Sequence, residues 1–243
     1  MKNALRAAFF IALKDMKTYY FKPPNISWGI LFPLVFVLAF YLRESGNFAV
    51  LVPGLLSLSL LFGTTSMEAI VITFERMTGA MERLMLYPVS ALTILSGKIA
   101  GGACFGIAIT IALFIGIQFV FSVPVKNIPL FLLSLILSSL AFSALGAFVS
   151  VSVKQVFEAQ TLANLFRFPM IFLSGVFIPV SALPPALRPV AYAMPLTYGI
   201  DCLKASFGYQ PEIMHPAASL AVLVMFTAVF LALSVKIMKG RIS

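Results

Sequence analysis

Charged residues are scarce in this chain, and acidic residues most of all. Only 10% of the 243 residues are charged and only 8 are acidic, whereas 61% are hydrophobic. A soluble globular protein needs many more polar side chains to cover its surface. Several charge-free runs also reach the roughly 18 residues that mark a membrane-spanning helix. The composition therefore excludes a soluble domain and predicts an all-α polytopic membrane protein.

Residues that perform chemistry are equally few. Cys104 and Cys202 are the only cysteines and lack the spacing of a disulfide or a metal site, and His215 is the only histidine. No predicted span contains two acidic residues, so the sequence offers no nucleophile–base pair or paired carboxylates at membrane depth. These shortages argue against an intramembrane enzyme. We expect no catalytic residue, no metal site and no cofactor bound by this chain.

The positive charge of the chain does not indicate nucleic acid as a partner. The net charge is +9, but the basic residues adjoin hydrophobic runs and form no compact patch interleaved with aromatic residues. Lipid headgroups and the enrichment of Lys and Arg on the cytoplasmic side explain them better. Most basic residues adjoin one side of the predicted spans, and four adjoin the other: Arg43, Lys126, Arg188 and Lys204. We therefore expect a multi-pass protein of the cell (cytoplasmic) membrane with both termini in the cytoplasm.

Six apolar runs predict six transmembrane helices, within a single membrane domain over residues 1–243. They cover residues 26–42, 48–73, 92–124, 128–153, 157–177 and 216–236. Ahead of them, residues 1–22 carry apolar side chains at helical spacing with basic side chains elsewhere, which predicts an amphipathic helix in the membrane interface. A signal peptide is the alternative, but the uncharged run is short and no small-residue cleavage site follows it.

Four charges cluster between the second and third predicted spans: Glu75, Arg76, Glu82 and Arg83. Gly79 and Pro88 disfavour helix and bracket a short helical segment at residues 79–87, whose apolar face includes Met81 and Leu84. No two of the four charges lie three or four residues apart with opposite sign, so they cannot pair within a helix. This pattern predicts charges that are free for a partner, with an ordinary solvated turn as the alternative.

A second broken stretch follows the fifth predicted span. Its glycine and proline positions are Gly175, Pro179, Pro184, Pro185 and Pro195. A plain external loop would account for these residues, but neighbours such as Tyr198 and Ile200 are too apolar for free solvent. Irregular backbone near the membrane requires protein or water to satisfy its hydrogen bonds.

Arg167 lies within the fifth predicted span. Ten residues after Phe157, it would be about 15 Å along the helix and inside the inner leaflet. A charge at that depth predicts a functional residue, for which Glu68 is a candidate counter-charge. The alternative is that the arginine side chain reaches towards the headgroups.

The two broken stretches resemble a known family. Residues 79–99, GAMERLMLYPVSALTILSGKI, resemble the cytoplasmic Gly-Thr-Leu-Glu-x-Leu-x-x-x-Pro-Val-Ser segment of ABC-2 type transporter permeases, with Ala80-Met81 where that family often has Thr-Leu. Residues 172–205, FLSGVFIPVSALPPALRPVAYAMPLTYGIDCLKA, are similar to the second signature of the same family. The likeness covers nearly the whole chain and extends to the small drug-export and nodulation-type permeases.

This resemblance implies a permease subunit that pairs with a second copy of itself and docks on two separate ABC ATPase subunits, which bind ATP and Mg. The segment at 79–87 would be the coupling helix, with eight coupling residues: Glu75, Arg76, Gly79, Met81, Glu82, Arg83, Leu84 and Pro88. Residues 181–207 would form external re-entrant helices, with an external gate made by Gly175, Pro179, Pro184, Pro185, Pro195 and Tyr198.

The sequence itself agrees that ATP hydrolysis belongs to a partner. No G-x-x-x-x-G-K-[ST] motif occurs, since Gly97-Lys98 lacks both the upstream glycine and the following Ser or Thr. A secondary transporter would more often show inverted repeats and an intramembrane acid for ion coupling. A membrane channel or structural subunit outside the ABC family is the alternative function. The apolar outer stretch favours export of an amphipathic, drug-like or lipid-linked substrate.

Overall fold

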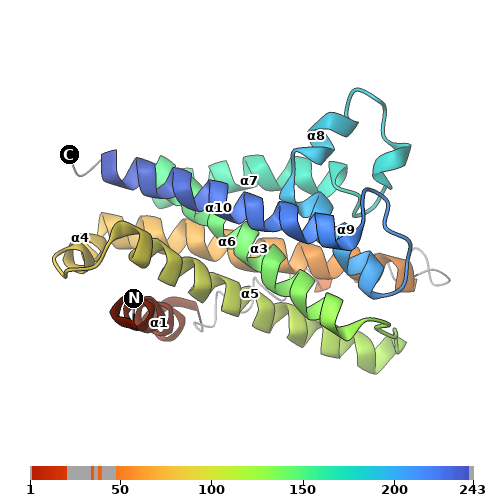
Figure 1. Ribbon diagram of the computed structural model, residues 1–243, viewed down its shortest axis with the longest axis horizontal. Coiled ribbons are helices and arrows are strands. Elements are labelled where there is room, and N and C mark those ends of the chain that lie inside the picture. The colour runs from red at the N-terminus through yellow and green to blue at the C-terminus, as the bar shows by residue number, and fades with distance from the viewer. Residues whose placement is uncertain (1, 21–33, 36–37, 40–47, 241–243) are drawn as a thin grey trace.

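Long helices run side by side along one axis and form the body of the molecule (Figure 1). The computed structural model describes residues 2–20, 34–35, 38–39 and 48–240, and these residues contain helices and no β-strand. The long elements are α3 (Phe48–Met77), α5 (Ala91–Phe121), α6 (Ile128–Ser152), α7 (Val156–Leu173) and α10 (Pro216–Gly240). The short ones are α1 (Lys2–Asp15) with the π-helical turn η1 (Met16–Tyr20), α4 (Ala80–Met85), η2 (Val180–Ala182), α8 (Arg188–Tyr192) and α9 (Pro195–Ser206).

Four of the described helices are long and apolar enough to cross a membrane. They are Ala49–Met77, Ala91–Phe121, Ile128–Ser152 and Pro216–Gly240, and they match four of the six predicted spans. The predicted fifth span forms helix α7, which is less apolar because it carries Glu158, Gln160, Asn164 and Arg167. The predicted first span, residues 26–42, lies outside the described residues except for 34–35 and 38–39.

Helix α3 is the centre of the bundle. It packs on α5, α6, α7 and α9, and its apolar residues Val52, Leu55, Leu56 and Leu60 are almost fully buried in the main hydrophobic cluster. A helix that is buried all round in this way has apolar side chains on every face. The main cluster thus holds the first half of α3, whereas Ile72 near the end that leads into α4 belongs to a second cluster.

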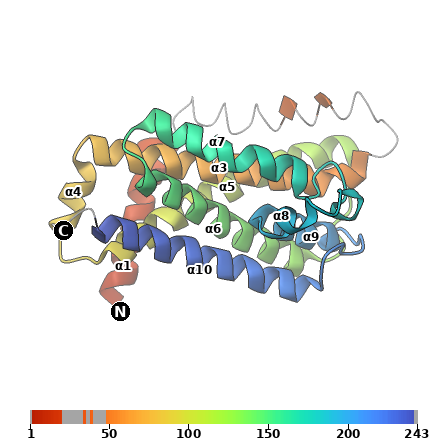
Figure 2. The ribbon, with the colours of Figure 1, turned by 90° about the horizontal axis from the view of Figure 1, so that it is seen from above.

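Helix α1 crosses the bundle instead of running along it. Figure 1 views α1 almost end-on, and Figure 2, turned by 90°, shows its length across the other helices at the end that carries α4 and the end of α10. Its small residues Ala8 and Ala12 face α5, whereas Leu5, Phe9 and Phe10 are more than half exposed. An apolar face turned away from the bundle is the arrangement expected of an interfacial helix.

Glycines on α5 allow two helices to approach closely. Gly97 and Gly101 lie against α1, whereas Gly102 and Gly106 lie against α3, where they meet Glu68 and Thr64. Small residues at this spacing allow helix backbones to approach closely, as they do here. Helix α5 thereby holds α1 on one side and α3 on the other.

Candidate functional site

The segment between α3 and α5 forms an elbow, which we define as residues 78–90. Gly79 adopts a left-handed conformation with φ of 70°, which reverses the chain direction after α3. Helix α4 follows and ends before Pro88. The Ser90 hydroxyl oxygen then accepts a hydrogen bond from the Thr93 backbone amide at 3.2 Å and caps α5. The breakers occur where the sequence predicted them, and the short helix, predicted over residues 79–87, spans Ala80–Met85.

The apolar side of α4 faces the interior of the protein. Met81 is fully buried in a cluster with Ile72, Ile94 and Met238, and Leu84 packs against the same cluster. The prediction that this face is available to a partner is therefore wrong for Met81. Six residues cannot form a stable helix alone, so α4 needs the ends of α3, α5 and α10 as support.

The exposed apolar surface near α4 comes from residues on either side of this helix. Met77, Leu86 and Tyr87 are 59%, 86% and 68% exposed, and they precede or follow the short helix. A partner that contacts the elbow would meet these three side chains together with the exposed charges of α4.

Two of the four clustered charges are engaged within the chain, which corrects the prediction that all four are free. Glu75 is fully buried and accepts hydrogen bonds from Lys14 Nζ at 2.5 Å and from Lys98 Nζ. Arg76 donates to the carbonyl oxygens of Ser150 and Val153 at 2.8 and 3.1 Å. These partners come from distant segments, which is why local spacing did not reveal them.

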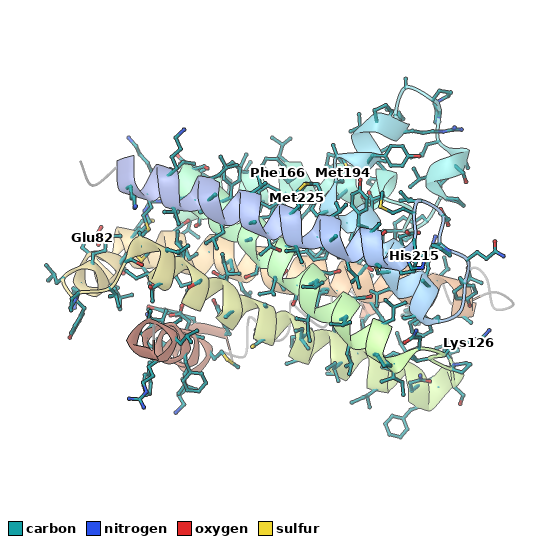
Figure 3. The ribbon with its side chains drawn as sticks, in the orientation of Figure 1. Glu82, Lys126, Phe166, Met194, His215 and Met225 are labelled. Atoms are coloured by element: carbon teal, nitrogen blue, oxygen red, sulfur yellow. The ribbon has the colours of Figure 1, made fainter. Side chains whose placement is uncertain are left out.

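Glu82 and Arg83 remain on the surface, as predicted. Both belong to α4 and are exposed. Figure 3 shows Glu82 at one end of the molecule, with Lys126 and His215 at the opposite end. Glu82 and Arg83 are an acidic and a basic side chain next to each other on the exposed face of a short helix. Such a pair can form specific polar contacts with another protein.

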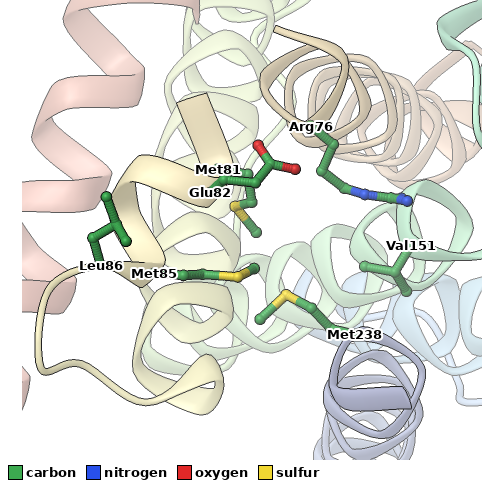
Figure 4. Close-up of a pocket in the computed structure, with 7 residues that line it drawn as sticks. All are labelled: Arg76, Met81, Glu82, Met85, Leu86, Val151 and Met238. Atoms are coloured by element: carbon green, nitrogen blue, oxygen red, sulfur yellow. The ribbon is translucent and has the colours of Figure 1, made fainter. Parts of the chain in front are cut away.

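A cavity of about 450 Å³ opens between α4 and the ends of α6 and α10. Its lining is Arg76, Met81, Glu82, Met85, Leu86, Val151 and Met238. Figure 4 shows the three methionine side chains around this space, with the Glu82 carboxylate at its edge. Methionine side chains adapt easily to different contacts. The cavity thus leaves open space beside α4 that is lined mainly by flexible side chains.

Arg167 is fully buried between α7 and α3 and does not reach towards headgroups. Its guanidinium donates to the Ser66 hydroxyl and to Asn164 Oδ1 at 2.8 Å, and it lies 4.7 Å from the centre of the Phe62 ring. Among the described residues no carboxylate pairs with it. Glu68 is not its counter-charge, because the Glu68 carboxylate instead accepts a hydrogen bond from the Tyr20 hydroxyl at 2.5 Å.

The second broken stretch packs at the opposite end of the bundle, where α8 and α9 lie (Figure 2). Gly175 is left-handed with φ of 88°, and its carbonyl oxygen accepts a hydrogen bond from Lys204 Nζ at 3.2 Å. Pro195 begins α9, which is buried between α6 and α10, and the Tyr198 hydroxyl donates to the Tyr192 carbonyl at 2.7 Å. The remaining predicted gate residues, Pro179, Pro184 and Pro185, are exposed.

Comparison with known proteins identifies this combination of helices and signatures. The model of the ABC-2 type transporter family matches residues 7–208, which include the elbow and the whole second broken stretch. The chain belongs to the ABC-2 type transporter family. The resemblance drawn from the two sequence segments is thereby confirmed, and the chain is an ABC-2 type permease.

The curated relatives of this permease include two named transport permeases and a nodulation protein. It is 27% identical over 133 residues to the inner membrane transport permease YhhJ of Escherichia coli, covering 54% of this chain and 36% of that protein. It is 24% identical over 157 residues to the inner membrane transport permease YadH of Escherichia coli, covering 65% and 61%. It is 29% identical over 106 residues to nodulation protein J of Rhizobium leguminosarum bv. viciae, covering 44% and 40%. Each match spans less than two thirds of the relative's length.

Family membership establishes the general role of the permease. It is a permease of the ABC-2 type, with several helices long and apolar enough to cross a membrane. The alternative of a channel or structural subunit outside the ABC family is therefore set aside.

Sequence reasoning missed two sets of buried charges in the permease. Asp201 on α9 is 2% exposed, and its carboxylate accepts hydrogen bonds from the Glu212 amide at 2.7 Å and the Ser219 hydroxyl at 3.1 Å. Asp15 and Lys98 are fully buried near the elbow. The signal was a charged residue inside an otherwise apolar helical run, the same signal that singled out Arg167.

Proposed function

We propose that the permease forms the transmembrane pathway of an ATP-driven exporter and that its elbow couples this pathway to a separate ABC ATPase. The observation that carries the proposal is the exposure of Glu82 and Arg83 on α4, a helix whose opposite face is held inside the permease by Met81. A short helix anchored on one side and charged on the other suits a contact that transmits movement into the bundle.

The assembly that we propose contains two permease copies and two ATPase copies. Each permease chain has one elbow among its described residues, and ATP hydrolysis by paired ATPases needs one docking site for each. ATP and Mg would bind to the ATPase subunits, in keeping with the lack of a phosphate-binding motif in this sequence. The native mass of a co-purified complex distinguishes this assembly from one with a different second permease.

The substrate class that we propose is amphipathic, drug-like or lipid-linked. Two features support it: the short helices α8 and α9, which would dip into the outer leaflet as an external gate, and the buried cation Arg167. The exposed residues of this stretch include Leu187, Val190 and Tyr192, which are apolar enough to contact lipid or an amphipathic molecule. A buried cation between two pathway helices suits a substrate with an anionic group.

Reconstitution tests this function directly. The permease is co-expressed with a candidate ABC ATPase from the same genome, and the purified complex is placed in proteoliposomes with a panel of drugs and lipid-linked molecules. We expect the permease to stimulate ATP hydrolysis and one substrate class to move outward in an ATP-dependent manner. A permease that neither co-purifies with the ATPase nor alters its hydrolysis rate would contradict the proposal.

A further inference from the structure

Four charged side chains form a ring where α1 crosses α3 and α5. Lys98 on α5 donates to Asp15 Oδ2 at 2.9 Å and to Glu75 Oε2. Lys14 donates to Glu75 Oε1 at 2.5 Å and lies 2.9 Å from Asp15 Oδ1, close enough for an ion pair although not aligned as a hydrogen bond. The four charges alternate in sign and sum to zero. We call this set, Lys14, Asp15, Glu75 and Lys98, the charge ring.

Three of the four members of the charge ring are shielded from their surroundings. The side chains of Asp15, Glu75 and Lys98 are 0% exposed, and that of Lys14 is 38% exposed. Burial alone would lower the pKa of Lys14, but its contacts with Glu75 and Asp15 outweigh burial and raise that pKa. Lys14 therefore stays charged. Loss of one member would leave a buried charge without its partner, which is far more costly than loss of an exposed pair.

A second contact joins the segment that follows α1 to helix α3, farther from the elbow than the charge ring. The Tyr20 hydroxyl at the end of η1 donates to Glu68 Oε1 at 2.5 Å, and Glu68 precedes Glu75 by two helical turns on α3. Burial and the nearby charge of Glu68 raise the pKa of Tyr20 well above its usual value, so the hydroxyl keeps its proton and remains a donor. Lys14 near the end of α1 and Tyr20 at the end of η1 are thus both bound to acidic residues of α3.

The position of the ring relates it to the elbow. Glu75 lies four residues before Gly79, where the chain turns into α4. Ile11 of α1 and Met81 of α4 belong to the same hydrophobic cluster, so α1 and α4 pack against the same apolar side chains. The charge ring adds directional contacts to this packing, because ion pairs with hydrogen bonds hold a defined geometry that apolar contacts alone do not.

We propose that Lys14, Asp15, Glu75 and Lys98 are positioning residues that make α1 and the elbow move as one unit when the ATPase acts on α4. This inference rests on the proposed coupling function, which it extends by assigning α1 to the moving part. It predicts that the ring can be opened without preventing folding, and that opening it separates ATP hydrolysis from transport.

Two variants open the ring in different ways. Glu75→Gln with Lys98→Met removes one charge of each sign and leaves the Lys14–Asp15 pair within α1, so no buried charge remains unbalanced while α1 loses its charged link to α3 and α5. Lys14→Gln removes only the partly exposed member, which makes it the milder change. Lys17→Gln is the matched control, since Lys17 lies three residues after Lys14 and is exposed.

The first measurement uses the permease alone in lipid nanodiscs. Spin labels replace the exposed residues Arg6 on α1 and Arg83 on α4, in a background where Cys104 and Cys202 are Ser. We expect one narrow distance distribution for the unchanged ring and for Lys17→Gln, and a broadened or shifted distribution for both ring variants. If the double variant does not fold, Lys14→Gln decides the question alone. An unchanged distribution in every folded ring variant would overturn the proposal.

The second measurement uses the unlabelled permease with its ATPase in proteoliposomes. We expect the amount transported per ATP hydrolysed to fall about fivefold or more in the ring variants and to stay unchanged in Lys17→Gln. A purely structural ring would lower the amount of folded protein but not this ratio, so an unchanged ratio would refute the positioning role. If the unaltered complex shows no coupled transport, the proposed function fails instead, and the distance measurement still decides whether the ring holds α1.

Discussion

Gly97 of α5 lies directly against the backbone of Ala8 in α1. A Cβ atom at position 97 would be 2.7 Å from the Ala8 carbonyl oxygen and 2.9 Å from its Cα atom. Backbone atoms cannot move aside as the end of a flexible side chain can. This contact therefore sets how closely α1 approaches the bundle, and with it the distance from Asp15 to Lys98.

Substitution of Gly97 by Ala should loosen α1. Overpacking costs about 1–3 kcal/mol, which outweighs the gain of up to about 1 kcal/mol that alanine brings to a helix. We expect faster hydrogen exchange in residues 2–20 and a lower free energy of unfolding in detergent. Gly116→Ala on the same helix is the control, because no atom of the described residues lies within 4 Å of a Cβ there, and it should be neutral or slightly stabilising.

The elbow charges should affect transport and not folding. Glu82→Ala with Arg83→Ala removes two exposed charges, each worth at most about 1 kcal/mol to stability, so insertion and expression should be unchanged. Export and substrate-stimulated ATP hydrolysis per inserted permease should fall, since the ATPase would lose the polar contacts that orient it. Lys154→Ala with Lys236→Ala is the control, as both residues are exposed in the same part of the molecule. Normal transport by the elbow variant would mean that its charges are only solvated.

Thiol labelling should show which end of the bundle faces the cytoplasm. In a cysteine-free background, Thr78→Cys at the elbow should react with an impermeant reagent only after permeabilisation, whereas Ser181→Cys at the opposite end should react in intact cells. Both positions are exposed. Labelling of position 78 from outside the cell would reject both the orientation and the coupling role of the elbow.

Asp201 should stabilise the end of the bundle that contains α9. Asp201→Ala leaves the Glu212 amide and the Ser219 hydroxyl without their acceptor, at a cost of about 1–3 kcal/mol. Asp201→Asn keeps an acceptor oxygen and should cost less. Thermal unfolding in detergent would measure the difference, and equal losses for Ala and Asn would indicate that the negative charge matters more than the hydrogen bonds.

Arg167 should matter to transport more than to stability. Arg167→Met retains most of the buried volume and removes a desolvated charge, so the unfolding free energy should be unchanged or higher. Transport of an anionic amphipathic substrate should fall at least about tenfold if the guanidinium holds it, since tenfold corresponds to about 1.4 kcal/mol. Arg167→Lys keeps the charge and should retain part of the activity. Full transport by the Met variant would show that Arg167 serves packing alone.

The amino-acid sequence was sufficient for features that depend on neighbouring residues. Gly79, Pro88 and Ser90 delimit the elbow through backbone conformation, loss of an amide donor and side-chain capping, all of which act within a few residues. Apolar runs likewise predict spanning helices, because length and composition alone decide whether a helix can cross lipid. The family resemblance was found in two contiguous segments, so it too depended only on the order of neighbouring residues.

Only the tertiary structure decided which charges are free and which way α4 faces. Glu75 is bound by Lys14 and Lys98, which lie 61 and 23 residues away, and its pairing depends on how closely the glycines of α5 admit α1. Met81 points inward because α4 rests on helices that converge there from separate parts of the chain. Spacing along one helix cannot predict such contacts, since they arise from the rotation and crossing of helices as they pack.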